Sequence, residues 1–131
     1  MKIPSFDAGY RPQGYARNEI GCWTGLLARP EYFSLDIVAR KAVCWDDGKG
    51  FPPAEILGVD CVEAGNRLQY DYHRGGSSDD KAVADAVYLH NLRVLIRKGG
   101  WLLRAFRLRR AAQIYRALRY GEYDNFNYTA K

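Results

Sequence analysis

The stretch DCVEAGNRLQYDYHRGGSSDDKAVADAVYLHNLRVLIRK, residues 60–98, contains two helical patterns separated by a turn. In the first pattern, small and apolar residues recur at intervals of three and four positions, which places them on one helical face. These residues are Cys61, Ala64, Gly65, Leu68 and Tyr72. Asp60 is a suitable N-cap, and Gly75-Gly76 ends the pattern because glycine adopts the left-handed conformation at little cost. The stretch therefore predicts a helix over residues 61–74.

The second pattern predicts a helix over residues 79–97, opened by Ser77-Ser78-Asp79-Asp80. Its acidic residues lie in the first turn and its basic residues in the last turns, and both placements suit the helix dipole. Two helices joined by so short a turn are expected to lie antiparallel. Gly99-Gly100 ends this helix, and a third helix is expected over residues 101–120.

The N-terminal half has a different texture, with Gly or Pro every few positions through residues 1–60. This density breaks long helices. Residues 32–38 alternate apolar and polar side chains, which is typical of a short strand, and residues 42–45 could pair with it. We therefore expect a mainly α fold: an antiparallel helical hairpin plus a third helix, preceded by an irregular Gly/Pro-rich half that can carry a small β-hairpin.

Length and composition indicate one globular domain over residues 1–131. The chain has 47% hydrophobic and 27% charged residues, and such values are ordinary for a folded domain. We divide it into an irregular part (1–60), a helical core (61–121) and an aromatic tail (122–131). No apolar run approaches the roughly 18–20 residues of a bilayer span, and we expect no secretory signal because no hydrophobic segment follows the first residues.

Cysteine and histidine usage argues against a structural zinc site. The chain has three cysteines, Cys22, Cys44 and Cys61, and two histidines, with no C-x-x-C spacing. Zinc sites usually show paired ligands at short spacing. We favour reduced thiols in a cytosolic compartment, with a single disulfide as the alternative.

The formal net charge of +5 is unevenly distributed. Residues 86–121 contain nine Lys and Arg residues and no Asp or Glu, whereas residues 1–85 sum to −3. On a helical wheel the basic residues of the third helix spread through most of the circumference, which favours protein contacts over a nucleic-acid groove or a membrane surface. The expected binding surface consists of Trp101, Arg104, Arg107, Arg109, Arg110 and Arg116.

Asp85 is the unusual residue of the second helix, because it shares a face with Leu89, Leu92 and Ile96. A carboxylate on an apolar stripe is costly unless it finds a partner. A tyrosine hydroxyl (Tyr72), an amide (Gln69) or an arginine could supply that partner. The alternative is that Asp85 is the remnant of an acid–base pair.

A resemblance bears on this alternative. Residues 64–76 and 79–89, together with the segment Ala112-Gln113-Ile114-Tyr115-Arg116-Ala117-Leu118-Arg119-Tyr120-Gly121, resemble a family of small phage proteins with a phospholipase A2-like core. Members of that family read His-Asp-aromatic-x-Tyr before a glycine turn, then Asp-Lys-x-x-Ala-Asp-x-x-Phe/Tyr-Leu. The resemblance covers residues 58–121, and residues 21–25 are faintly similar to the family's calcium loop.

The resemblance implies the fold but argues against the activity. In that family a histidine acts as general base on water, an aspartate on the antiparallel helix orients it, and a second aspartate holds Ca²⁺. The matching positions here are Leu68 for the histidine and Gln69 for the metal aspartate, so only the orienting acid survives, as Asp85. We expect no catalytic residue, metal or cofactor, and we interpret His73 and His90 as surface, capping or structural residues.

The resulting expectation is a non-catalytic phage protein that uses a degenerate phospholipase A2-like fold for protein–protein binding. It would act as a virion or tail component, or as an inhibitor of a host system, and so would lie in the virion or the host cytoplasm. Its partner would be a further copy of itself or a host protein. Two alternatives stay open. One is an active calcium-dependent lipid or ester hydrolase with a displaced base, and the other is a nucleic-acid-binding module that uses Arg104, Arg107, Arg109 and Arg110.

Overall fold

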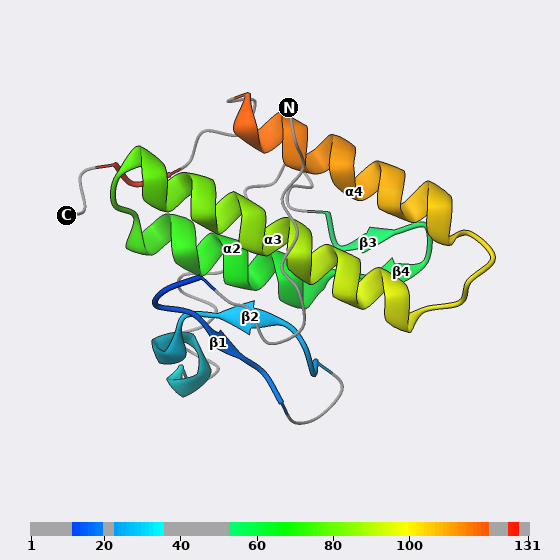
Figure 1. Ribbon diagram of the computed structural model, residues 1–131, viewed down its shortest axis with the longest axis horizontal. Coiled ribbons are helices and arrows are strands. Elements are labelled where there is room, and N and C mark those ends of the chain that lie inside the picture. The colour runs from blue at the N-terminus through cyan, green and yellow to red at the C-terminus, as the bar shows by residue number, and fades with distance from the viewer. Residues whose placement is uncertain (1–11, 20–22, 36–52, 121–125, 129–131) are drawn as a thin grey trace.

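Three helices form the body of the protein. The computed structural model describes residues 12–19, 23–35, 53–120 and 126–128. The helices are α2 (Val62–Arg74), α3 (Ser78–Lys98) and α4 (Arg104–Arg119). Helix α3 packs against both of the others and runs antiparallel to each (Figure 1). The predicted helical hairpin with a third helix is thereby confirmed.

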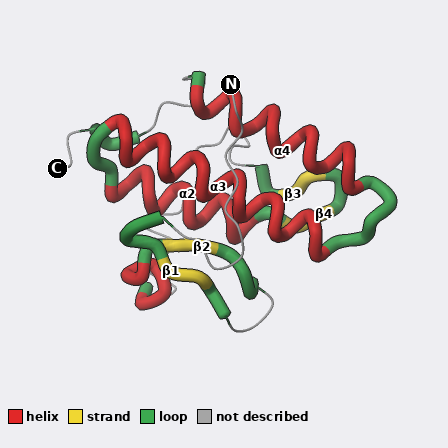
Figure 2. The backbone as a smooth tube through the Cα atoms, viewed as in Figure 1, coloured by secondary structure: helices red, strands yellow, loops and turns green. Residues whose placement is uncertain are grey.

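The strands are short and occur in two antiparallel pairs (Figure 2). Strand β1 (Ala16–Arg17) pairs with β2 (Leu27–Ala28), and β3 (Glu55–Ile56) pairs with β4 (Val59–Asp60). The first pair lies against α3, and the second lies beside α3 and α4. The mainly α class with small hairpins in the N-terminal half is confirmed.

The strand predicted over residues 32–38 is wrong at its start. Residues Pro30–Ser34 form a 3₁₀ helix, η1, with Pro30 in its first turn. Proline fixes φ near the helical value and so favours this start. Tyr32 is buried and Phe33 is exposed, so Phe33 does not face the core as an inward position of a strand would. Residues 42–45, the expected partner strand, lie outside the described residues.

Local signals place both ends of α2. The N-cap is Cys61, and Asp60, which we had expected to cap the helix, is the last residue of β4. Its carboxylate still accepts a hydrogen bond from the N–H of Val62 at 3.0 Å. Asp60 therefore satisfies a donor of the first helical turn although it lies one residue before the N-cap. At the other end Gly75 has a φ of 72°, and a Cβ there would lie 2.0 Å from the carbonyl oxygen of Asn127.

Helix α3 begins with a capping box. The Ser77 hydroxyl accepts a hydrogen bond from the N–H of Asp80, and the Asp80 carboxylate accepts one from the N–H of Ser77. The observed helix extends one residue beyond the prediction at each end. Helix α4, in contrast, starts at Arg104, because residues 101–103 form a turn before it.

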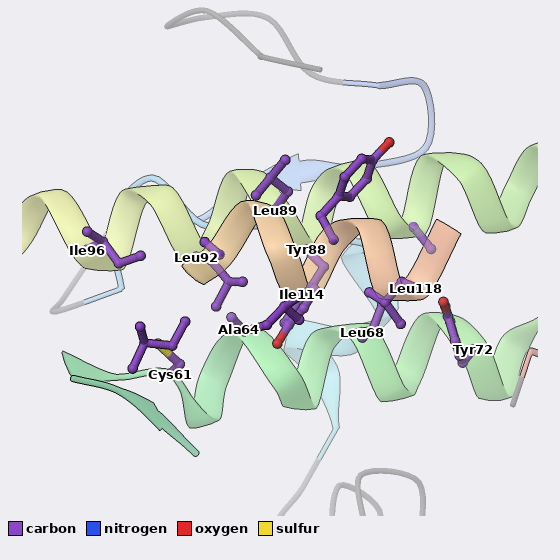
Figure 3. Close-up of a cluster of buried hydrophobic side chains, with 14 of the residues drawn as sticks. Cys61, Ala64, Leu68, Tyr72, Tyr88, Leu89, Leu92, Ile96, Ile114 and Leu118 are labelled. Carbon is purple, nitrogen blue, oxygen red and sulfur yellow. The ribbon is translucent and has the colours of Figure 1, made fainter. Parts of the chain in front are cut away.

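The core lies between the three helices and consists of aliphatic and tyrosine side chains (Figure 3). Leu68 and Tyr72 lie on the side of α2 that faces α3 (Figure 3). A smaller cluster of Tyr15, Leu27 and Val87 lies beneath the first strand pair. Of the helices in the described part of the chain, none has the length and apolar character needed to cross a bilayer.

Candidate functional site

Asp85 is completely buried and accepts hydrogen bonds from residues of all three helices. Its Oδ1 accepts one from the Tyr72 hydroxyl. Its Oδ2 accepts one from Lys81 Nζ at 3.0 Å and one from an Arg119 Nη at 2.8 Å. Lys81 Nζ also donates to the carbonyl oxygen of Leu118 at 2.8 Å. Charge-assisted hydrogen bonds of this kind compensate for the desolvation of a buried carboxylate.

The expectation that a tyrosine hydroxyl or an arginine satisfies Asp85 is therefore confirmed, with both present. Burial and the neighbouring carboxylate raise the pKa of Tyr72 far above its ordinary value, so its hydroxyl stays protonated and donates. Lys81 was missed by the sequence analysis, although it lies four residues before Asp85 and that spacing places the two on one side of a helix. Arg119 is 34 positions away, and only packing brings it close.

The position matched to a catalytic base belongs to the core. Leu68 lies one turn before Tyr72 and is buried among the side chains of the three helices. Gln69 is half-buried. His73 is exposed at the end of α2, and His90 Nε2 lies 3.1 Å from the carbonyl oxygen of Gly25. The Asp85 cluster thus contains one acid, two cations and a phenol, and no imidazole among its hydrogen-bonding partners.

Two further carboxylates are buried, and the sequence analysis did not single them out. Glu63 accepts hydrogen bonds from the Tyr32 hydroxyl at 2.8 Å and from Arg67 Nε at 2.9 Å. Asp71 accepts one from the Tyr15 hydroxyl at 2.8 Å and lies 3.7 Å from Arg29 Nε. The four-residue spacing of Glu63, Arg67 and Asp71 is the signal that could have revealed this second polar face of α2.

Asp71 has weaker hydrogen-bonding partners than Glu63, since its arginine lies 3.7 Å away instead of 2.9 Å. Burial raises its pKa to about 7, against the opposing effects of the Tyr15 hydrogen bond and the Arg29 charge. The same burial, together with the Asp71 charge, raises the pKa of Tyr15. Asp71 therefore titrates near neutral pH at the contact between α2 and the N-terminal segment.

Asn91 attaches the first strand pair to α3. Its Oδ1 accepts a hydrogen bond from the N–H of Leu27 at 2.7 Å, and its Nδ2 donates to the carbonyl oxygen of Leu27 at 2.9 Å. The side chain thus pairs with both backbone groups of one residue, as a neighbouring strand would. The preceding residue of α3, His90, contacts the carbonyl oxygen of Gly25, two residues before Leu27. Burial lowers the pKa of this histidine.

The arginines of α4 divide into two groups. Arg119 contacts Asp85, Arg104 donates to the carbonyl oxygens of Arg97 and Gly99, and Arg107 donates to those of Leu57 and Gly100. The others, Arg109, Arg110 and Arg116, are exposed. At 3.6 residues per turn Arg110 lies about 100° around the helix from Arg109, whereas Arg109 and Arg116 share one side. We call this side, which also contains Tyr120, the outer face of α4.

Large apolar side chains are exposed where α3 meets α4. Trp101 is 76% exposed, Leu102 75%, Phe106 61% and Leu103 39%. We call these four residues the corner. The expected binding surface is therefore divided. Trp101 lies in the corner, Arg109 and Arg116 lie on the outer face, and Arg110 is exposed between the two. Arg104 and Arg107 bind backbone carbonyls.

The described residues contain no cluster of three or more His, Cys, Asp and Glu side chains that could hold a metal ion. Of the segment likened to a calcium loop, Gly21 and Cys22 lie outside the described residues. Cys61 is buried, and burial raises the pKa of its thiol to about 11, so the unreactive thiol form prevails at neutral pH. Cys44 also lies outside the described residues.

Comparisons with known proteins return no match to a family model, to a curated protein or to a solved structure.

Proposed function

We propose that this chain is a non-catalytic protein that binds another protein and that its three-helix core serves as the scaffold. The state of Asp85 carries this proposal. The acid that would orient a catalytic base receives hydrogen bonds from Tyr72, Lys81 and Arg119, and Leu68 occupies the position of that base. Such a cluster supports packing of the three helices and leaves the carboxylate no evident role in proton transfer.

The outer face of α4 is the proposed binding surface. Its exposed arginines lie in a segment without any Asp or Glu from residue 86 to residue 121, so we expect an acidic partner. Arginine and aromatic residues contribute strongly to protein interfaces, because they combine apolar area with directed hydrogen bonds. The resemblance to phage proteins supports a virion or tail component, or an inhibitor of a host system, as the setting.

The test compares the proteins that the wild type and two variants capture from the same lysate. A pull-down from infected host lysate, read by mass spectrometry, is carried out with the wild type, with Arg109→Glu/Arg116→Glu and with Arg74→Glu. Arg74 is exposed at the far end of α2, where it pairs with Glu31 at 3.4 Å, and this charge reversal is the control. We expect an acidic protein that wild type and Arg74→Glu enrich and the outer-face variant does not. Identical captures by all three would contradict the proposal.

The hydrolase alternative makes a different prediction. Calcium-dependent release of fatty acid from phospholipid vesicles, abolished by Asp85→Asn in a folded sample, would replace our proposal with an enzyme. We expect release no faster than in buffer. Because Asp85→Asn also removes a buried charge, circular dichroism at the assay temperature must show that the variant is folded.

A nucleic-acid-binding module is the second candidate, and one observation favours it. Arg109 and Arg116 share one side of α4 with Tyr120, whereas the sequence suggested a spread around the helix. Arg104 and Arg107, which belonged to that prediction, are engaged by carbonyl groups. Binding through the outer face would weaken steeply with salt, because each phosphate contact releases counterions. A mobility shift at low salt that is lost in Arg109→Glu/Arg116→Glu would support this candidate.

A further inference from the structure

The corner is the most exposed apolar surface among the described residues. Three of its four side chains, Trp101, Leu102 and Phe106, are more than 60% exposed. Leu57, 53% exposed on the β3–β4 turn, extends this surface, because Arg107 ties that turn to the start of α4. Soluble monomers rarely place several large apolar side chains together in water, and such patches usually mark an interaction site.

The corner projects from the fold and is held in place. It lies at the end of the helical bundle opposite the α2–α3 turn (Figure 1). Arg104 and Arg107 donate hydrogen bonds to the carbonyl oxygens of Arg97, Gly99 and Gly100, which fixes the loop between the helices. The loop is thus preorganised with its apolar side chains outside, and little conformational entropy remains to be lost on binding.

The charges around the corner are mainly positive. Arg97 and Lys98 are exposed at the end of α3, and Arg110 is exposed one turn beyond Phe106. Among the described residues the nearby acids are Glu55 and Asp60, both exposed on the β3–β4 pair. The Asp60 carboxylate accepts a hydrogen bond from a backbone N–H at the start of α2. Cations outnumber acids around the corner among the described residues, and this excess of positive charge favours an anionic partner.

Three occupants have to be weighed. A second copy that used the same surface would bring arginines and lysines against each other, and like charges oppose such a contact. A partner protein would need an apolar pocket shaped to a projecting tip. An anionic lipid surface needs no pocket, since apolar side chains enter the boundary between headgroups and acyl chains while cations remain among the phosphates. Tryptophan also favours this interface.

We propose that the corner is a docking site for anionic phospholipid surfaces. Trp101, Leu102 and Phe106 enter the headgroup–acyl boundary, and Arg97 and Lys98 contact lipid phosphates. The attachment is peripheral and reversible. It goes beyond the proposed function, which uses the outer face of α4, and leaves that face available to a protein partner.

The experiment measures binding of the full chain to vesicles by co-sedimentation and by Trp fluorescence. One vesicle is pure phosphatidylcholine, and the other contains equal parts of phosphatidylcholine and phosphatidylglycerol. The apolar variant is Trp101→Ser/Leu102→Ser/Phe106→Ser and the charge variant is Arg97→Gln/Lys98→Gln. Trp23→Ser is the control, because Trp23 is also exposed, at 43%, on the loop between β1 and β2.

We expect the wild type and Trp23→Ser to bind the anionic vesicles and to bind neutral vesicles at least about tenfold more weakly. The apolar variant should lose binding. The charge variant should bind about 25-fold more weakly, since each cation near an anionic surface contributes about fivefold. Binding of the wild type should also shift its Trp emission to the blue, because Trp101 moves from water into the headgroup–acyl boundary.

Four results would overturn the proposal. These are no binding to anionic vesicles, equal binding to both vesicles, unchanged binding of the apolar variant, and a wild-type dimer in sedimentation velocity that the apolar variant lacks. The last result would show that a second copy covers the corner. Failure here would leave the proposed protein binding untouched, because that test alters Arg109 and Arg116.

Discussion

The Asp85 cluster and the corner lie towards opposite ends of α3, and both depart from the rule that apolar residues are inside and charged residues outside. At the Asp85 cluster, charges are buried, and Tyr72, Lys81 and Arg119 all donate to one carboxylate. At the corner, apolar side chains are exposed and nothing in the described chain covers them. The buried charges at Asp85 are compensated by hydrogen bonds within the fold and hold the three helices together. The exposed apolar side chains of the corner contribute no such contacts and are available for binding.

The strongest test of this contrast removes the acid of the cluster. Asp85→Ala should lower the free energy of unfolding by about 3–5 kcal/mol, because it leaves the buried Lys81 and the partly exposed Arg119 without their shared anion. Urea unfolding followed by circular dichroism measures the loss. The matched control is Asp79→Ala, an exposed acid in the first turn of the same helix, which should change stability by less than about 1 kcal/mol. Equal effects of the two substitutions would mean that the cluster contributes no stability.

The second test concerns the attachment of the N-terminal segment. Asn91→Ala leaves the N–H and the carbonyl oxygen of Leu27 buried without partners, so we expect a loss of about 2 kcal/mol. Asn91→Asp keeps the acceptor for the N–H of Leu27, but only a protonated carboxyl can also donate to the carbonyl oxygen. We therefore expect it to lose less stability than Asn91→Ala only at a pH where the carboxyl is protonated. Hydrogen exchange should accelerate first in β1 and β2. Uniform acceleration across α3 as well would show that this strand pair does not open separately.

The third test uses pH and concerns Asp71. The folded-state pKa of Asp71, about 7, lies above the value of about 3.9 for an unfolded aspartate. The native state therefore retains a proton that the unfolded state releases. Stability from this group is complete below pH 4 and falls on the order of 1 kcal/mol per pH unit up to about pH 7.

Asp71→Asn should remove this decline, because an amide does not titrate. Thermal unfolding of wild type and variant at pH 5 and pH 8 makes the comparison, with Asp79→Asn as control. We expect the melting temperature of Asp71→Asn, relative to wild type, to be higher at pH 8 than at pH 5. The same offset at both values would show that Asp71 does not titrate in this range.

The smallest expected effect is at the corner. Trp101→Ser/Leu102→Ser/Phe106→Ser should change the free energy of unfolding by less than about 1 kcal/mol in total, since surface substitutions outside special features have small effects. Leu92→Ala, a fully buried residue of α3, should cost about 2–5 kcal/mol in the same measurement. A large loss from the corner variant would mean that these side chains pack against the fold after all.

The helices were predictable because their signals are local. Ser77 and Asp80 cap α3 through side chains three residues apart, and Gly75 ends α2 with a conformation that glycine favours. The start of α4 was predicted three residues too early, since nothing in the composition of residues 101–103 distinguishes a turn from a helix. A strand of two residues is too short to show an alternating pattern, which explains why the positions of both strand pairs were not predicted although a small hairpin was expected in this half.

The site was predictable in part. The sequence marked Asp85 as an acid that needs a partner and named a tyrosine and an arginine as possible donors. The spacing of Lys81 also suggested contact, and we overlooked it. The buried pair of Tyr15 and Asp71 joins residues 56 positions apart, and no spacing rule reaches so far.

The sequence by itself determined the helical class, the hairpin, the demand of Asp85 for a partner and the excess of cations in residues 86–121. These follow from contacts within about one helical turn or from simple counts. Only the tertiary structure decided that Arg119 turns inward to Asp85, that Arg107 binds the carbonyl of Leu57, and that Arg109 stays exposed. The three arginines are chemically identical, and the packing of α4 against α3 and the β3–β4 turn places each beside a different neighbour.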